Sequence, residues 1–539
     1  MTQLRVLLAQ RLRRDWLQLT LWIAGTVGLA FAGYGGVADT YGTEQDRIGT
    51  LAAVMANPVI LLFRGLPSGA DESALLVFLL LPWLAVMGSF MSTFLAVRHT
   101  RGDEEIGRLE LVDATPAGRW APTVATLVHG TLAALALGIL VAASFLAGGA
   151  ATEGALLVGA SVAAVTLVFL AVGMLSAQLM RTSRGANSLA VWILIATFVL
   201  RGIGNAMGTP SDDLTRMESS WLTWASPFGW GENTRAFDEN QWWPLLPCLA
   251  AFVVLMAAAF ALQAVRDVGG GIVPERAGRA AARGALSSTT VLVSRLSAPS
   301  TVGWMVGGLL TGALSTTLGK VLDQVAGENP TIADVLRSLA ASGDLEQAVV
   351  VVFFTMVGLF AACAAVQTVA RARQEEAHGT AEAVLATPVQ RVRWLANFLV
   401  VGFIAILLTC AAAVGGAALG ATGDDAGPEL LRAAVVAAAG QVVAASVFLV
   451  LTALVFAVAP HLTIPLGWTL VSVAIVLGLF GPLFDFPDAL VNLSPFAVTP
   501  QIDGDGVDLR GLWWLVLAVA AGGAASLVLM RRRELAPEG

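Results

Sequence analysis

Long apolar runs, separated by short polar segments, fill nearly the whole chain. The runs are rich in Leu, Ala and Val, and they do not alternate apolar with polar residues. A helix needs roughly 20 apolar residues to cross a hydrocarbon core about 30 Å thick, whereas the strands of a membrane barrel would alternate. Because only helices and closed barrels satisfy their backbone polar groups in lipid, the pattern predicts an all-α polytopic membrane protein.

The apolar runs predict about twelve transmembrane helices, six in each half of the chain. This divides the sequence into a first six-helix unit over 1–265, a cytoplasmic linker with an amphipathic helix over 266–299, and a second six-helix unit over 300–539. The predicted spans are 16–36, 74–97, 122–147, 154–180, 188–207 and 243–265 in the first unit, and 300–322, 347–370, 394–416, 430–457, 464–484 and 512–530 in the second.

Two shorter stretches are predicted to form amphipathic helices. Leu4–Leu12 places leucines on one helical face, opposite Arg5, and Val291–Leu296 is its counterpart after the linker. Helices of this kind lie in the membrane interface. We therefore expect both stretches to lie on the membrane surface, ahead of the first span of each unit.

Composition and charge exclude a soluble protein and orient the chain. Of its 539 residues, 57% are hydrophobic and only 13% are charged, with a mean hydropathy of +0.77. A soluble domain usually carries about 25% charged residues. With the N-terminus inside, most of the 31 Lys and Arg residues fall in inner segments, while outer loops carry acids such as Asp212, Asp424 and Asp503. The positive-inside rule therefore predicts that both termini are cytoplasmic.

Two predicted cytoplasmic loops, one after the second span of each unit, share a sequence. Residues 101–119 read RGDEEIGRLELVDATPAGR, and residues 373–391 read RQEEAHGTAEAVLATPVQR; they align without a gap. Six spans return the chain to its starting side, so the repeat is parallel and predicts a pseudo-two-fold axis along the membrane normal. The identical pairs are Arg101/Arg373, Glu104/Glu376, Gly107/Gly379, Glu110/Glu382, Val112/Val384, Ala114/Ala386, Thr115/Thr387, Pro116/Pro388 and Arg119/Arg391.

The likeness of these loops indicates a shared surface role. Apolar spans tolerate many sequences, whereas a loop that docks on another protein needs particular shapes and charges. Two matched loops therefore predict two matched docking surfaces and a partner that is present as two similar subunits. A short helix in each loop is expected to end at the Thr-Pro pair, because the residue before proline avoids the α region. The alternative is that both loops are only positive-inside anchors.

The loops resemble the coupling loops of ABC-2 type permeases, which are exporters with six spans per unit. The resemblance rests on Glu-Glu…Gly-x-x-Glu…Ala-Thr-Pro in both loops, on RDVGGGIVPERAGRA in the linker, and on WLTWASPFGWGENTRAF…WWPL in an outer loop, and it covers essentially the whole chain. Within that group the sequence is most similar to the duplicated actinobacterial permeases that export polyketide antibiotics and other drugs.

The resemblance implies the permease subunit of an ATP-driven exporter in the bacterial plasma membrane, which moves hydrophobic or amphipathic compounds outward. Two copies of a separate cytoplasmic ABC ATPase, carrying the ATP and Mg²⁺, would dock on the two loops. Because Ala377 stands where the first loop has Glu105, the two docking sites are not identical. The implied docking residues are Glu104, Gly107, Glu110, Thr115, Pro116 and Arg119, and Glu376, Gly379, Glu382, Thr387, Pro388 and Arg391.

The chain itself is not expected to be an enzyme. A P-loop needs the pattern GxxxxGK[ST], and the only lysine of the chain is Lys320, which Val321 follows. No bound cofactor, metal site or nucleic-acid partner is expected either. The predicted span interiors contain no Asp or Glu, which argues against a proton-coupled secondary carrier.

Two ionisable residues lie inside predicted spans. His129 stands alone in the third span, and we expect it to be a hydrogen-bonded packing residue. Arg201 in the fifth span either extends to the outer interface or pairs with an acidic residue of an outer loop. An architectural role for Arg201 is favoured over a role in substrate binding or gating.

By analogy with the family, the second and fifth spans of each unit line the transport path. The alternative is that the aromatic residues there face lipid or pack in the core. Export of lipid or glycolipid stays open as a second function, and a twelve-span secondary drug carrier or a non-transporting scaffold as less favoured ones. The path candidates are Phe90, Phe94 and Phe198 in the first unit, and Phe354, Phe360 and Trp468 in the second.

Overall fold

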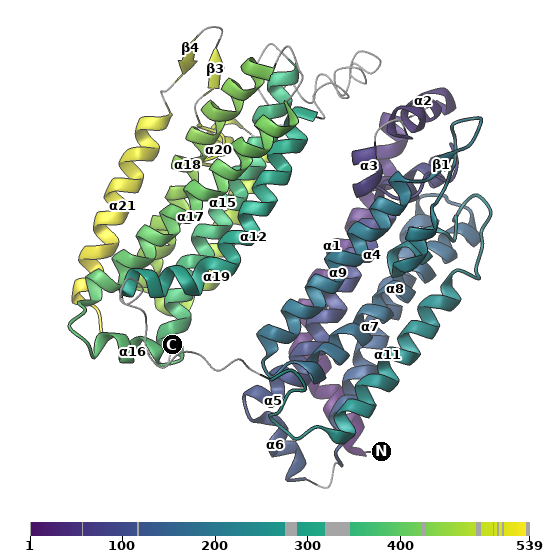
Figure 1. Ribbon diagram of the computed structural model, residues 1–539, viewed down its shortest axis with the longest axis horizontal. Helices are drawn as coiled ribbons and strands as arrows, with labels where there is room; N and C mark the ends of the chain where they lie inside the picture. Colours follow the sequence, from purple (N-terminus) through teal and green to yellow (C-terminus); the bar gives the residue numbers. More distant parts are fainter. Residues whose placement is uncertain are drawn as a thin grey trace. The chain divides into compact units, whose positions relative to one another are not determined.

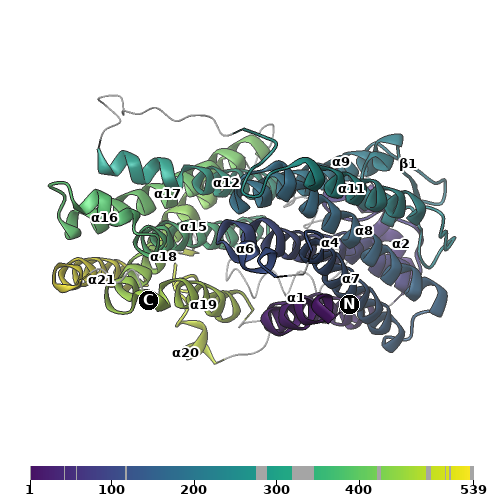
Figure 2. The same cartoon turned by 90° about the horizontal axis from the view of Figure 1, so that it is seen from below.

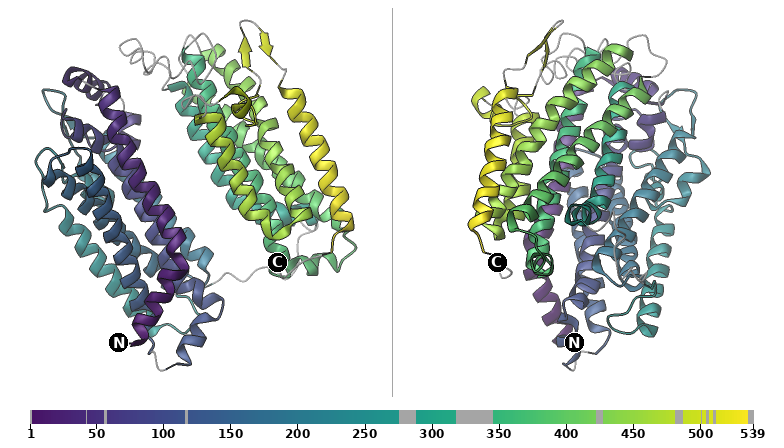
Figure 3. Two further views of the ribbon diagram at one scale, coloured as in Figure 1. Left: turned by 180° about the vertical axis from the view of Figure 1, so that it is seen from behind. Right: turned by 60° about the vertical axis from the view of Figure 1, so that its left-hand side comes forward.

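The computed structural model divides into two compact units, Met1–Gly278 (unit 1) and Arg279–Gly539 (unit 2), and each is described by itself (Figure 1). Within each unit, long helices run side by side (Figures 1 and 3). The structure describes residues 2–534 except 42, 56–57, 116–117, 275–287, 318–344, 422–426, 481–486, 500, 504–505 and 509–510.

Unit 1 is a bundle of long helices with short elements at both ends. Its elements are α1 (Thr2–Thr40), α2 (Glu44–Met55), α3 (Pro58–Phe63), α4 (Glu72–Val97), the π-helical turn η1 (Arg98–Gly102), α5 (Asp103–Glu105), α6 (Arg108–Asp113), α7 (Ala121–Ala147), α8 (Thr152–Leu179), α9 (Ser183–Ala206), β1 (Thr209–Pro210), β2 (Met217–Glu218), the 3-10 helix η2 (Trp221–Ala225), α10 (Pro227–Glu232) and α11 (Leu245–Val265). Helices α4 and α8 are the most buried, and α1, α7, α9 and α11 pack around them (Figure 2).

Capping side chains and small residues explain why these helices begin and pack where they do. Asp71 accepts a hydrogen bond from the Ser73 backbone N–H at 3.1 Å at the start of α4, and Thr182 accepts one from Gly185 at 3.1 Å at the start of α9. Such caps satisfy N–H groups that a helix leaves unpaired. A Cβ atom at Gly138 of α7 would collide with the backbone of α8, so these two helices come into backbone contact.

Unit 2 has its own bundle, centred on α15 and α18. Its elements are α12 (Thr289–Thr317), α15 (Leu345–Ala377), α16 (Thr380–Leu385), α17 (Arg391–Gly420), α18 (Gly427–Val458), the 3-10 helix η4 (Pro460–Leu462), α19 (Thr463–Ile475), the π-helical turn η5 (Val476–Phe480), α20 (Asp488–Val491), β3 (Gln501–Asp503), β4 (Gly506–Asp508) and α21 (Leu512–Arg532). Helix α12 packs along α17, where Gly312 and Gly416 leave no room for a Cβ atom between the two backbones.

Among the described residues, 11 helices are long and apolar enough to cross a membrane. They coincide with all but one of the predicted spans, and this confirms the predicted fold class of an all-α polytopic membrane protein. The remaining predicted span, 300–322, overlaps α12, which begins earlier at Thr289 and is not among the 11. Residues 318–322 of that span lie outside the described residues.

The two stretches predicted to be amphipathic helices are helical, but each is part of a longer helix. Leu4–Leu12 forms the first part of α1, which continues into the first span, and Val291–Leu296 lies inside α12. Arg5 is exposed, whereas Arg11 is buried and donates a 2.7 Å hydrogen bond to Thr126 of α7. A position of these stretches in the membrane interface stays a prediction.

The repeated loops lie at the ends of their own units. In unit 1, α5 and α6 lie at the same end as the start of α1, and α2, α3 and β1 lie at the opposite end (Figure 1). In unit 2, α16 lies near the end of α21, and β3 and β4 lie at the opposite end. Each loop is thus at the other end of its unit from the predicted outer loops. The pseudo-two-fold axis between the units stays a prediction.

Candidate functional site

The repeated loops have the same local fold. In each loop a glycine in the left-handed region precedes a short helix: Gly107 (φ 74°) before α6 and Gly379 (φ 73°) before α16. This conformation favours glycine because other residues have a Cβ atom that crowds the backbone. Sequence identity at these positions therefore records a backbone turn that both units need.

Glu104 in the first loop is buried and bonded within unit 1. Its carboxylate forms a two-pronged ion pair with Arg266, with both N–O distances at 2.9 Å, and the two side chains are only 4% and 8% exposed. It also lies 3.1 Å from Arg101 and accepts a hydrogen bond from the Gly269 N–H at 2.5 Å. Arg266 is the C-cap residue that directly follows α11. The loop is therefore tied to the end of the last helix of unit 1.

Glu376 makes the matching contact in unit 2. Its carboxylate pairs with Arg533, and the two side chains are 1% and 11% exposed. Arg533 is the C-cap residue that directly follows α21, the last helix of unit 2. Its guanidinium also donates to the Phe456 carbonyl at 3.0 Å and lies 4.6 Å from the centre of that ring. The same type of residue thus holds the same loop position in both units.

The far ends of the loops bind the same terminal arginines. Arg119 donates to the carbonyl oxygens of Gln263 and Arg266, the latter at 3.1 Å, and Arg391 donates to the carbonyl oxygen of Arg533 at 2.6 Å. Cationic side chains are favourable at helix C-termini, where carbonyl groups lack partners. We call Glu104, Arg119 and Arg266 the loop clamp of unit 1, and Glu376, Arg391 and Arg533 the loop clamp of unit 2.

Other matched residues lie on the loop surfaces. Glu110 and Glu382 are exposed, and the hydroxyls of Thr115 and Thr387 each donate a 2.6 Å hydrogen bond to the carbonyl three residues earlier. Pro388 is exposed, whereas Pro116 lies outside the described residues. The matched set therefore divides into residues that bond within their unit, of which Glu104 and Glu376 have buried side chains, and residues that are exposed on the loop.

The loop surfaces differ between the units. The first loop exposes two large apolar side chains, Ile106 (59%) and Leu111 (74%). The aligned residues of the second loop are His378 and Ala383. Glu105, which has no acidic counterpart in the second loop, accepts a 3.0 Å hydrogen bond from the Ser183 N–H.

Two path candidates of unit 1, Phe90 and Phe198, pack against the same hydrophobic core cluster. In unit 1, Phe90 and Phe94 contact each other, with ring centres 5.7 Å apart, whereas Phe198 packs against Trp83 and Phe228. The same unit contains a largely apolar cavity of about 400 Å³, bounded by α8, α9, α10 and α11.

In unit 2, the three path candidates differ in exposure and contacts. Phe354 is fully buried, Phe360 lies 5.5 Å from Trp304 between ring centres, and Trp468 is 36% exposed. Their role in a transport path stays a prediction.

Arg201 pairs with an acidic residue of an outer loop, which is one of the two possibilities left open by the sequence. Its guanidinium lies 2.8 Å from the carboxylate of Glu232, and both side chains are buried. Glu232 also accepts a 2.7 Å hydrogen bond from Asn205. Burial raises the pKa of Glu232, and Arg201 and Asn205 act against that rise. Arg201 also lies 4.3 Å from the centre of the Phe198 ring.

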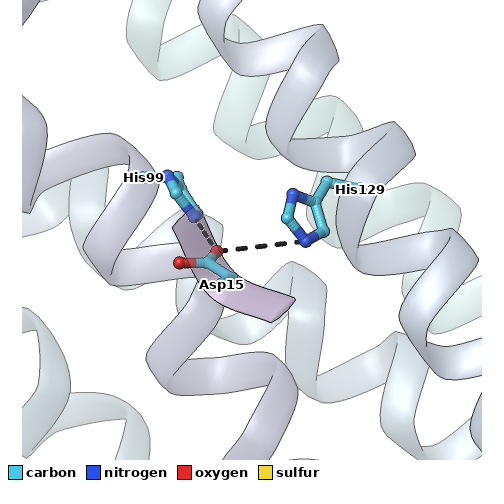
Figure 4. Close-up of side chains that lie close together, drawn as sticks. All are labelled: Asp15, His99 and His129. Atoms are coloured by element: carbon cyan, nitrogen blue, oxygen red, sulfur yellow. Dashed lines mark hydrogen bonds and ion pairs between the residues drawn. The ribbon is translucent and has the colours of Figure 1, made fainter. Parts of the chain in front are cut away.

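His129 is not the isolated, hydrogen-bonded residue that the sequence predicted. It lies beside His99, with ring centres 5.5 Å apart, and its Nε2 atom is 3.9 Å from a carboxylate oxygen of Asp15 (Figure 4). Asp15 is buried within α1. The argument against a proton-coupled carrier, which relied on the absence of acidic residues inside the predicted spans, is therefore weaker. The partners were missed because Asp15 and His99 lie just outside the predicted spans.

Two comparisons identify the family. Residues 286–531 match the family described as "Multidrug efflux system permease Rv1217c, C-terminal domain". The chain is also 35% identical over 541 residues to the "Multidrug efflux system permease protein Rv1217c" of Mycobacterium tuberculosis (strain ATCC 25618 / H37Rv), and this alignment covers 98% of the chain and 94% of that protein. With such identity over nearly its full length, the chain belongs to the family of multidrug efflux system permeases that includes Rv1217c.

Proposed function

We propose that this chain is the membrane subunit of an ATP-driven drug exporter, with two copies of a separate cytoplasmic ABC ATPase docked on its two loops. It moves hydrophobic or amphipathic compounds from the cytoplasm or the inner leaflet to the outside. The observation that carries this proposal is the repeated loop clamp, which holds an exposed short helix in the same way in both units.

The loop clamps suit a loop that receives force. Glu104 and Arg119 connect the first loop to the end of α11, and Glu376 and Arg391 connect the second loop to the end of α21. Force on α6 or α16 would therefore reach the last helix of the unit through charge-assisted contacts, which are the stronger class of hydrogen bond. A loop that only anchors the chain at the membrane surface needs no such connection.

The exposed residues of the loops suit contact with a partner. Exposed apolar side chains such as Ile106 and Leu111 mark interaction sites when polar residues surround them. Glu110 and Glu382 add matched charges at both loops. In this proposal Glu110, Glu382 and the exposed apolar side chains bind the ATPase, and the loop clamp residues position them. The ATP and Mg²⁺ are bound by that ATPase, because the chain has no P-loop sequence.

The apolar cavity of about 400 Å³ in unit 1 supports an apolar substrate, since small-molecule sites are mostly apolar and about 300–1,000 Å³ in size. Residues Phe169 and Trp230 contribute aromatic surface to it. Lipid or glycolipid export is the second candidate, because an acyl chain would also suit this lining. The positive-inside bias places the loops and both termini on the cytoplasmic side of the bacterial plasma membrane.

The proposal is tested with the double substitution Glu110→Ala and Glu382→Ala in the full chain, reconstituted in liposomes with its ATPase. We expect the ATPase to bind about tenfold more weakly, because the few side chains that dominate an interface cost more than about 1 kcal/mol when truncated. Drug-stimulated ATP hydrolysis should fall with it. The matched control is Glu153→Ala with Glu429→Ala, which removes two exposed glutamates in the first turns of α8 and α18.

Three results would separate this proposal from its rivals. Normal assembly and normal drug-stimulated ATP hydrolysis in the Glu110/Glu382 double variant would contradict the docking role. Drug transport driven by a proton gradient, without any ATPase, would establish a secondary carrier. Stimulation of ATP hydrolysis by lipid but by no drug would favour lipid export.

A further inference from the structure

Three side chains that can bind a metal ion meet near one end of unit 1, next to the beginning of the first loop. Asp15 comes from α1, His99 from η1 and His129 from α7 (Figure 4). All three are buried, and one ligand atom from each lies within 4.8 Å of the others. Asp15 bonds directly to His99 Nε2 and lies 3.9 Å from His129 Nε2. Two imidazole nitrogens and a carboxylate oxygen therefore converge.

This arrangement leaves the His129 ring unsatisfied. The residue is 0% exposed, and neither of its ring nitrogens has a hydrogen-bond partner among the described residues. A buried polar group without a partner costs about 1–3 kcal/mol in proteins. An imidazole that is only a packing residue would be expected to bond to a nearby carbonyl. Here its Nε2 atom instead faces the same carboxylate oxygen that His99 contacts.

A second carboxylate lies behind His99. The Nδ1 atom of His99 is 3.5 Å from Asp103, the first residue of α5, and Asp103 is held by Arg14 at 2.9 Å. In metal sites, a ligating histidine almost always donates its second ring N–H to a carboxylate, a carbonyl or a water molecule, which fixes the ring for binding. His99 approaches this arrangement: one ring nitrogen contacts Asp15, and the other lies 3.5 Å from Asp103 without a hydrogen bond.

We propose that Asp15, His99 and His129 bind one divalent transition-metal ion of the zinc class. Imidazole ligands favour such ions over Mg²⁺ or Ca²⁺, which prefer all-oxygen sites. Ligand atoms lie about 2.0–2.2 Å from zinc, which places neighbouring ligands of a tetrahedral site about 3.4 Å apart. In such a site His129 Nε2 would approach Asp15 by about 0.5 Å, and His99 Nε2, which contacts Asp15 directly, would move away from it. Three protein ligands leave the fourth position for a water molecule or an anion.

The nearby arginines set the strength of this site. Arg11 donates to the His99 carbonyl at 3.3 Å, and Arg98 lies 3.3 Å from the second carboxylate oxygen of Asp15. Their positive charges oppose a divalent cation, whereas Asp15 and Asp103 favour it. The Arg98 side chain is 36% exposed, so it can turn towards solvent when the ion binds. We therefore expect removal of the Arg98 charge to strengthen metal binding.

The ion would connect elements in unit 1 only. Extending the loop alignment in both directions at the same offset places Arg371 and Val401 opposite His99 and His129. Neither of these can replace an imidazole as a ligand. The site therefore joins α1 and α7 to the beginning of the first loop, and unit 2 has no counterpart at these positions. This inference concerns metal binding and does not depend on the proposed exporter function.

The test uses the full chain in detergent, freed of metal with a chelator and titrated with Zn²⁺ against a competing indicator, and with Co²⁺ by visible absorption. We expect one equivalent per chain. His99→Ala and His129→Ala should each weaken binding at least about 100-fold, Asp103→Asn about 10–100-fold, and Arg98→Gln should strengthen it up to about fivefold. The control is His378→Ala with His461→Ala, which removes the two exposed histidines and should change nothing.

Gel filtration and thermal unfolding without metal show whether each variant is folded. The proposal is overturned if the wild-type chain does not bind one equivalent, or if folded His129→Ala binds zinc as tightly as the wild type. Loss of binding in the His378/His461 control instead would assign the ion to the surface. Because Arg98→Gln is expected to act in the opposite direction, general destabilisation of unit 1 cannot produce the whole pattern.

Discussion

At the scale of single residues, buried charges define the architecture of unit 1. Arg201 is 0% exposed and contacts Glu232, two backbone carbonyl groups and the face of Phe198. The sequence indicated that an arginine inside a span needs a partner, but it did not select Glu232. That residue lies in the loop motif GENTRAF, where hydrophobic periodicity gives no information about which side chain turns inward.

The Arg201–Glu232 pair gives a residue-scale prediction. Glu232→Ala should lower the free energy of unfolding by about 3–5 kcal/mol, because it leaves a buried arginine without its counter-charge. Glu239→Ala, which breaks the partly exposed pair with Arg235, should cost less than about 1 kcal/mol. Chemical unfolding in detergent measures both. Equal effects of the two substitutions would contradict a structural role for the buried pair.

At the scale of elements, the loop clamps explain part of the sequence repeat. Glu104, Glu376, Arg119 and Arg391 are identical between the loops because they bind Arg266 or Arg533 within their own unit. Gly107 and Gly379 are identical because of their left-handed backbone. The sequence singled out these positions but explained them by docking alone. The two terminal arginines could have been found from the sequence. Arg266 is the first charged residue after the last predicted span of unit 1, and Arg533 belongs to the basic run that follows the last predicted span of unit 2.

The loop clamp predicts a local effect on the first loop. Glu104→Ala should speed amide hydrogen exchange within α6 by at least about tenfold, because it leaves Arg266 buried and unpaired. Exchange in α16 of unit 2 should not change. Glu105→Ala removes the neighbouring exposed carboxylate, which bonds to Ser183 at the start of α9 and not to the loop clamp, and is the matched control. If both substitutions change exchange in α6 equally, the clamp does not hold the loop.

The sequence predicts features that depend on local composition, but it does not predict contacts between residues that are far apart along the chain. Long apolar runs predicted the spans well, because crossing a membrane depends on local composition. The loop clamps, the Arg201–Glu232 pair and the Asp15–His99–His129 cluster each join residues that lie on different elements. Periodicity within one segment cannot reveal such contacts. The N-terminal helix shows the same limit, since its sequence alone does not reveal that Arg11 bonds to Pro122 and Thr126 of α7.

At the scale of the whole molecule, the chain is a membrane permease made of two helical units with matched loops. Family membership establishes the class of multidrug efflux permease, and the loop clamps support a pair of driving subunits. The units are not copies in every respect. The first loop exposes Ile106 and Leu111 and lies next to the proposed metal site, whereas the second exposes His378. The proposal therefore implies two docking sites of unequal strength.

The central claim is that one chain binds two ATPase subunits through its two loops. The most direct measurement is the mass of the intact complex, purified with its ATPase from membranes and measured by native mass spectrometry. The account predicts the mass of one 55.8 kDa chain plus two ATPase copies, with the Glu110/Glu382 double variant losing ATPase. A functional exporter that contains one ATPase copy or none per chain would contradict it.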